Sequence, residues 1–195
     1  MRVAVMGTSG SGKTTLGRRL GLALGLPFIE LDTINWRPGW YDLNLNEPEE
    51  FVRQVALAIS ADAWVSDGNY GLVRRLIWAR ATDLIWLDYS RAVIMPRIIG
   101  RSLWRSLTKA EVWAGTGNRE HWREWFKRDH LIRWAWETHK GRRVRFEAAL
   151  AEPGLEHLRV HRLRHPRDAK RLEVRLASGR PDAGQDRRPG PGTAR

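Results

Sequence analysis

The sequence predicts an α/β fold in which helices cover both faces of a parallel sheet, giving three layers with one helical insertion. Three observations lead to this prediction. Short apolar segments alternate with stretches of helical spacing along the 195 residues. A glycine-rich loop joins the first apolar segment to the first helical stretch. The stretch from about 91 to 150 is nearly strandless, basic and rich in tryptophan. Strands that alternate with helices favour a parallel sheet, because each helix returns the chain to the start of the next strand.

Five apolar segments predict the strands. The first four are short and apolar enough to be buried, whereas the last alternates between apolar and polar residues. In chain order, the predicted strands cover residues 2–6, 28–31, 64–66, 84–87 and 157–163.

Helical spacing and end signals predict the helices. Gly25 stops the first helix, and Pro48 suits the first turn of the second. Thr108 to Glu111 has the pattern of a capping box, which predicts a short helix that Gly115 ends. The longer helices are expected over residues 13–24, 48–59, 71–79, 91–107, parts of 119–150, and 166–176.

Composition sets further limits. The net charge is +12, and residues 91–145 hold eleven Arg and three Lys against five acidic residues. The absence of cysteine excludes disulfides and thiolate metal sites. Because no signal peptide or membrane-length apolar stretch is visible, we expect a cytoplasmic protein. Residues 1–177 are expected to form one domain, and 178–195, rich in Gly, Pro, Arg and Asp, a disordered tail.

The glycine-rich loop at residues 7–14 reads G-T-S-G-S-G-K-T and fits the Walker A pattern G-x-x-x-x-G-K-[ST]. Its glycines let backbone N–H groups face one anion, and the next helix directs its positive end at the same point. Lys13 brings a charge to the outer phosphates, and the Thr14 hydroxyl can coordinate Mg²⁺. The sequence therefore predicts a P-loop NTPase fold that binds ATP and Mg²⁺ through Gly7, Thr8, Ser9, Gly10, Ser11, Gly12, Lys13, Thr14 and Thr15.

Three aspartates, Asp32, Asp67 and Asp88, follow predicted strands. Ligands of such sheets bind beyond the carboxyl ends of the strands. Each aspartate could hold Mg²⁺ through water or accept a proton from a hydroxyl; the alternative for each is a helix or turn cap. The tight turn after Asp67 would direct that residue at the nucleotide and turn Asn69 and Tyr70 toward a second substrate.

Together these segments resemble the adenylate-kinase-like P-loop kinases. Most of the first 175 residues are similar to the DNA topology modulation protein family, in its actinobacterial-type branch. The shared segments are the loop at 7–14, Leu31-Asp32, W-R-P-G-W at 36–40, W-V-S-D-G-N-Y at 64–70, Leu87-Asp88 and G-N-R-E at 117–120.

The resemblance implies that Asp67 has an Mg²⁺-linked role and that Asp32 touches an acceptor hydroxyl, as a carboxylate does in shikimate-type kinases. Adenylate kinases carry D-G-F-P-R where this chain has D-G-N-Y-G. The arginine that grips a nucleoside monophosphate is therefore missing from its usual place, which argues against AMP. Arg74 or Arg75, just beyond, would have to replace it.

In this class of kinase a helical lid brings arginines to the transferring phosphoryl group. Arg97, Arg101 and Arg105 recur every four residues and share one helical face, which suits such a lid. Arg119 and Arg123 have the same spacing. The alternative for both rows is a solvated basic face.

Trp36 and Trp40 flank a Pro-Gly pair just after Asp32. This places them on the acceptor side, where an aromatic ring could support a planar substrate. Structural packing of the loop is the alternative. Residues 164–167 occupy the position that lines adenine in adenylate-kinase-like enzymes.

We therefore expect an ATP-dependent phosphotransferase with a small-molecule acceptor whose identity stays open. The expected catalytic residues are Lys13, Asp32, Arg101 and Arg105, and the expected metal ligands are Thr14 and Asp67. The acceptor would be bound by Asp32, Trp36, Asn69, Tyr70 and Arg74. The alternative is a nucleotide-dependent regulatory or nucleic-acid-binding protein that uses the basic segment at 91–145, although no DNA-reading module is present. ATP or GTP preference and oligomeric state stay open.

Overall fold

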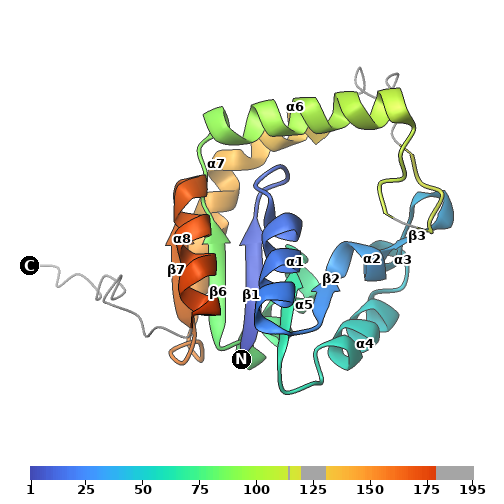
Figure 1. The fold of residues 1–195 in the computed structure, drawn as a ribbon. Coiled ribbons are helices and arrows are strands. Elements are labelled where there is room, and N and C mark those ends of the chain that lie inside the picture. The colour runs from blue at the N-terminus through green and yellow to red at the C-terminus, as the bar shows by residue number, and fades with distance from the viewer. Residues whose placement is uncertain (114, 120–130, 179–195) are drawn as a thin grey trace, which may run out of the picture.

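A computed structural model describes residues 1–113, 115–119 and 131–178 (Figure 1). In this part of the chain a parallel sheet has the strand order β2-β5-β1-β6-β7. Each strand corresponds to a predicted one, with ends that differ by two residues at most. The strands are β1 (Arg2–Gly7), β2 (Phe28–Glu30), β5 (Trp64–Asp67), β6 (Asp83–Leu87) and β7 (Arg159–Leu163).

The longer helices also follow the sequence prediction. Gly25 takes a left-handed conformation with φ 65° and ends the first helix where the pattern placed the end. The helices are α1 (Lys13–Leu24), α4 (Pro48–Ala58), α5 (Gly71–Arg80), α6 (Arg91–Thr108), α7 (Leu131–Leu150) and α8 (Pro166–Ala177), with the short α2 (Leu31–Asn35) and α3 (Leu43–Asn46).

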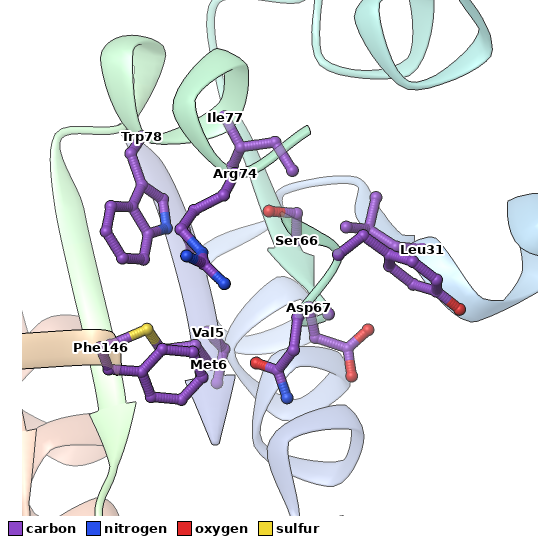
Figure 2. Close-up of a pocket in the computed structure, with 13 residues that line it drawn as sticks. Val5, Met6, Leu31, Ser66, Asp67, Arg74, Ile77, Trp78 and Phe146 are labelled. Atoms are coloured by element: carbon purple, nitrogen blue, oxygen red, sulfur yellow. The ribbon is translucent and has the colours of Figure 1, made fainter. Parts of the chain in front are cut away.

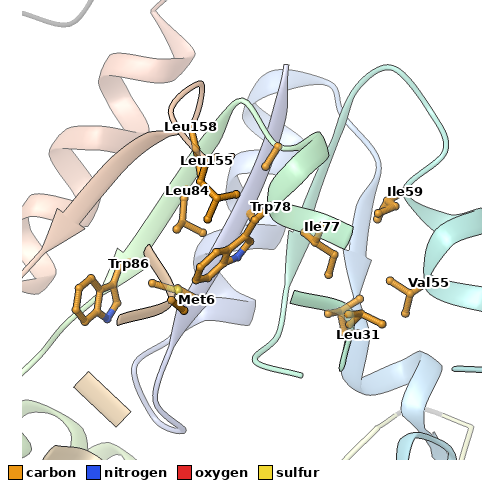
Figure 3. Packing of buried hydrophobic residues seen from close by; sticks show 14 of the residues in the cluster. Met6, Leu31, Val55, Ile59, Ile77, Trp78, Leu84, Trp86, Leu155 and Leu158 are labelled. Carbon is orange, nitrogen blue, oxygen red and sulfur yellow. The ribbon is translucent and has the colours of Figure 1, made fainter. Parts of the chain in front are cut away.

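Alternate residues of β1 face opposite layers, as the pleat of a strand requires. Val3 and Val5 lie in a core with α1, α6 and α8. Ala4 and Met6 lie in the other core, with α4, α5 and the end of α7; Figure 3 shows Met6 beside Trp78 in this cluster. The predicted three-layer α/β sandwich is confirmed.

A small hairpin leaves the main sheet after α2. Its strands β3 (Trp36–Arg37) and β4 (Tyr41–Asp42) pair antiparallel, and the 3₁₀ turn η1 (Pro38–Trp40) joins them. From the opposite side, α6 crosses the carboxyl end of the sheet above the loop at 7–14, and the chain then descends toward the hairpin (Figure 1).

The short helix predicted from Thr108 to Gly115 is wrong. Thr108 ends α6, Lys109 is left-handed with φ 51°, and the chain closes a turn through a bridge between Glu111 and Arg119. Asn118 explains the difference. It is 2% exposed, and its amide accepts a hydrogen bond from Trp40 N at 2.9 Å and donates one to the Arg37 carbonyl at 3.0 Å. These tertiary contacts override the local capping signal.

Some predictions fall outside the described residues. They are the helix content of 120–130, with Arg123, and the tail from 179 onward. The bounds of the single domain stay a prediction. Among the described helices, none combines the length and the apolar character that crossing a membrane requires.

Candidate active site

The loop at 7–14 joins β1 to the amino end of α1, as a phosphate-binding loop requires. Gly10 and Gly12 have φ of 76° and 88°, a region that favours glycine. Gly10 also lies so close to α6 that a Cβ there would collide with the Ile98 side chain. Glycine at position 10 therefore allows both the positive φ of the loop and the close approach of α6.

Arginines of α6 reach down to this loop. Arg97 Nη1 donates to the Ser11 carbonyl at 3.3 Å, and Arg101 Nη2 donates to Ser9 Oγ at 3.0 Å. Arg105 lies further along the helix and donates to the Val112 carbonyl at 3.4 Å. The orientation of the first two supports a lid over the loop rather than a basic face turned to a polymer.

Thr14 and Asp67 meet beneath the loop. The Thr14 hydroxyl donates to Asp67 Oδ2 at 2.5 Å, and Asp67 is 2% exposed. Burial raises the pKa of Asp67 to about 6, while the charge of Lys13 and the hydrogen bond from Thr14 act in the opposite direction. Hydroxyl and carboxylate oxygens are ligands that Mg²⁺ prefers when substrate phosphates and water complete its shell. The pair therefore fits the predicted metal site.

The turn after Asp67 connects two parts of the site. Asn69 accepts a hydrogen bond from Gly7 N at 3.3 Å and donates one to the Gly7 carbonyl, so its amide fixes the start of the loop. Tyr70 donates its hydroxyl to Asp32 Oδ1 at 2.7 Å. The sequence predicted that both residues face a second substrate. Both line the larger of the two clefts described next, but the hydrogen bonds of their polar groups go to protein atoms.

Two clefts flank the loop. The α8-side cleft has a volume of about 410 Å³ and lies between the loop, α1, α6 and α8; Pro166, in the segment predicted to line adenine, is in its wall. The α5-side cleft has about 630 Å³. The residues that line this second cleft are Ser9, Lys13, Asp32, Trp36, Asn69, Tyr70, Gly71, Arg74, Arg142, Arg145 and Phe146.

Three arginines, Arg74, Arg142 and Arg145, make the lining of the α5-side cleft strongly basic. Arg74 of α5 lies beside Trp78 and Phe146, with its guanidinium 5.6 Å from each ring centroid (Figure 2). Burial lowers the pKa of Arg74, and burial together with repulsion from Arg145 lowers the pKa of Arg142 to about 10. Positive charge is therefore held partly out of water beside a cavity, a setting that favours an anionic ligand.

Sequence reasoning missed Arg142 and Arg145. The sequence showed that the segment 91–145 is basic. The one pattern that could have singled out Arg142 and Arg145 is their spacing of three residues, which puts both on one face of a helix. The orientation of α7 about its own axis decides which of its arginines face the cleft, and the sequence does not give that orientation.

Asp88 fixes that orientation. It accepts hydrogen bonds from Arg143 Nε at 2.8 Å and Arg162 Nε at 2.9 Å, so it ties α7 to the end of the sheet. The sequence left Asp88 open between a metal or proton role and a cap. None of the three strand-end aspartates is the N-cap of the next helix, and Asp88 is an ion-pair anchor.

Three tryptophans join the hairpin to the turn after α6. Trp36 stacks on Trp113 with centroids 5.3 Å apart and planes 11° apart, and Trp40 meets both rings edge-on. Since Trp113 covers one face of Trp36, packing accounts for much of this cluster. Trp36 still lines the α5-side cleft, whereas Trp40 is not among the residues that line it.

Comparisons with known proteins add limited information. No protein-family model matches the chain. A curated shikimate kinase from Rhodopseudomonas palustris is 58% identical over 31 residues, so the matched segment spans 16% of this chain and only 15% of that protein.

Three of the similar solved structures are small-molecule kinases by name. A gluconokinase from Sinorhizobium meliloti 1021 has 19% identity and a TM-score of 0.47, covering 91% of this chain and 94% of the other. A sugar kinase from Janibacter sp. HTCC2649 has 21% identity and a TM-score of 0.49, covering 91% and 92%. A shikimate kinase from Bacteroides thetaiotaomicron has 16% identity and a TM-score of 0.49, covering 91% and 96%. At these values none of them assigns an activity to this chain.

Proposed function

We propose that this chain is an ATP-dependent phosphotransferase that uses Mg²⁺ and acts on a small acceptor with both a hydroxyl group and an acidic group. The observation that carries this proposal is that Lys13 of the phosphate loop and Asp32 line one cleft. A phosphate-binding lysine and a strand-end carboxylate at one cavity are what transfer to a hydroxyl requires. The 31-residue segment that is 58% identical to a shikimate kinase accords with a small-molecule acceptor.

In the proposed reaction the acceptor oxygen attacks the γ-phosphorus of ATP. A new P–O bond forms, the bond to the bridging oxygen breaks, and ADP leaves with that electron pair. Asp32 takes the proton of the acceptor hydroxyl. Lys13 and Arg101 stabilise charge on the transferred group, and Arg105 supports the lid that carries Arg101.

Thr14 and Asp67 would hold Mg²⁺, which when bound neutralises charge on the outer phosphates. The nucleotide would lie along the loop with its base in the α8-side cleft. Membership of the DNA topology modulation family and a cytoplasmic location are further parts of this proposal.

The acidic group of the acceptor follows from the arginines that line the α5-side cleft. Arg74, Arg142 and Arg145 line it together. Guanidinium groups bind carboxylate and phosphate oxygens in pairs of hydrogen bonds, and partial burial strengthens the attraction. An acceptor with an anionic end would offset the cost of burying these charges, which lowers the pKa of Arg74 and Arg142, and the repulsion from Arg145.

The test measures ADP formation with ATP, Mg²⁺ and a panel of small hydroxylated carboxylic acids, phosphorylated metabolites and uncharged analogues. We expect an acidic compound to raise turnover well above hydrolysis. Arg74→Ala should raise the KM for that acceptor about 10- to 100-fold, the worth of a charged hydrogen bond, and leave the KM for ATP unchanged.

The matched control is Arg75→Ala, because Arg75 is exposed and pairs with Glu152 at 3.3 Å outside the cleft. It should change neither KM. If no compound raises turnover, the phosphotransferase proposal fails. If uncharged analogues serve best, the acidic group is refuted and the transfer reaction stands.

A further inference from the structure

Tyr70 occupies an unusual place in the cleft. Its hydroxyl donates to Asp32 Oδ1 at 2.7 Å although the two residues lie 38 positions apart. Both line the α5-side cleft together with Lys13. A carboxylate has two oxygens that accept hydrogen bonds. Tyr70 occupies Oδ1, and no described residue donates a hydrogen bond to Oδ2.

The surroundings of Tyr70 fix its ring. Phe51 of α4 is fully buried and packs against it with ring centroids 4.9 Å apart. Just before it, Gly68 has φ 145°, and a Cβ there would lie 2.7 Å from the Leu31 side chain. The turn therefore lies directly against the residue that precedes Asp32, and only glycine allows this approach.

Chemistry fixes the direction of the hydrogen bond. Burial first, and then the charge of Asp32, raise the pKa of Tyr70 far above its usual range. The phenol therefore keeps its proton, and Tyr70 acts as a donor to Asp32 rather than as an acid or base.

We propose that Tyr70 is a positioning residue for Asp32. Its hydroxyl holds Oδ1 so that the second carboxylate oxygen meets the acceptor hydroxyl on the Lys13 side of the cleft. This inference rests on the proposed function, since it gives Asp32 the task of accepting the proton. Tyr70 itself neither gains nor loses a proton during transfer.

The kinetic test compares Tyr70→Phe, which keeps the ring, with wild type, using the best acceptor from the panel. We expect kcat to fall about 10- to 100-fold, as for loss of a hydrogen bond to a charged group, and the KM for ATP to stay within about twofold. Tyr41→Phe is the control. Tyr41 lies on the exposed hairpin and donates its hydroxyl hydrogen bond to Glu47, which does not line the cleft. It should behave as wild type.

A double-mutant cycle separates positioning from general packing. In an Asp32→Asn background, adding Tyr70→Phe should change kcat less than about twofold, because the group that Tyr70 orients is already gone. Full additivity of the two effects would overturn the inference.

A readout without any acceptor keeps the inference separate from the proposed function. The chain has three tyrosines, so labelling with 3-fluorotyrosine gives three ¹⁹F NMR resonances, which Tyr41→Phe and Tyr89→Phe assign. Asp32→Asn should move the Tyr70 resonance and leave the other two. An unmoved Tyr70 resonance would overturn the inference, whether or not an acceptor is found. A shift in a protein that phosphorylates nothing would leave the Tyr70–Asp32 contact established and the proposed function refuted.

Discussion

Replacing Asp67 by asparagine is expected to stabilise the ligand-free protein at neutral pH while removing Mg²⁺-dependent turnover. Burial raises the pKa of Asp67 from 3.8 to about 6, so the folded protein holds this proton more tightly than the unfolded chain does. The protonated carboxyl therefore favours folding fully below about pH 4, and this contribution is lost as the pH rises through about 6. At roughly 1.4 kcal/mol per pKa unit, the loss is about 3 kcal/mol.

The assay is urea unfolding of wild type and Asp67→Asn without nucleotide or metal, from about pH 4 to about pH 7. Because other groups titrate equally in both proteins, the difference in free energy of unfolding isolates position 67. It should move by about 2.4 kcal/mol in favour of the variant over this range, because part of the roughly 3 kcal/mol falls outside it. A difference that stays constant with pH would refute the reasoning.

Asp83 provides a control of opposite sign. It is also buried, which opposes ionisation, but hydrogen bonds from His161, Thr82 and Arg159 prevail and lower its pKa. Ionised Asp83 therefore stabilises the fold above its unfolded pKa, and that contribution is lost as the pH falls. Asp83→Asn should accordingly be less stable than wild type by an amount that stays constant above about pH 4 and shrinks only below it, whereas the difference for Asp67→Asn changes between about pH 4 and pH 7.

Further expectations follow from the loop and the lid. Lys13→Ala should abolish ATP binding, measured by calorimetry, and normal affinity would contradict the phosphate-loop assignment. Gly10→Ala should lower the unfolding temperature and weaken ATP binding, because the new Cβ meets Ile98 at a positive φ; unchanged values would show that α6 does not rest on the loop. Asn118→Ala should cost about 1–3 kcal/mol, since it leaves the Arg37 carbonyl and Trp40 N–H without this partner. Faster proteolysis after α6 would support that reading, and wild-type resistance would oppose it.

The sequence predicted well those helices and strands whose ends and burial depend on residues close in the chain. The bounds of α1 follow from the loop glycines at one end and Gly25 at the other, and the helix in the structure has these bounds. The apolar strands were also placed well, because a strand that is buried on both faces appears in the sequence as a continuous run of apolar residues.

Contacts between distant segments could not be predicted. The arginines of α7 face the cleft because Asp88 fixes Arg143, and no periodicity carries that information. The turn at 111–119 follows Asn118 rather than its own capping signal. Asn69 and Tyr70 were expected to face a second substrate. They lie in the cleft, but their polar groups bond to Gly7 and Asp32, which a motif alone does not reveal.

The two clefts have a consequence for the order of events. They lie on opposite sides of the phosphate loop, and the residues that line one are different from those that line the other. If the nucleotide occupies one cleft and the acceptor the other, as proposed, either substrate can enter while the other is bound. If transfer occurs, we expect it within a ternary complex with random order of addition, seen as intersecting rather than parallel lines in double-reciprocal plots of initial rate.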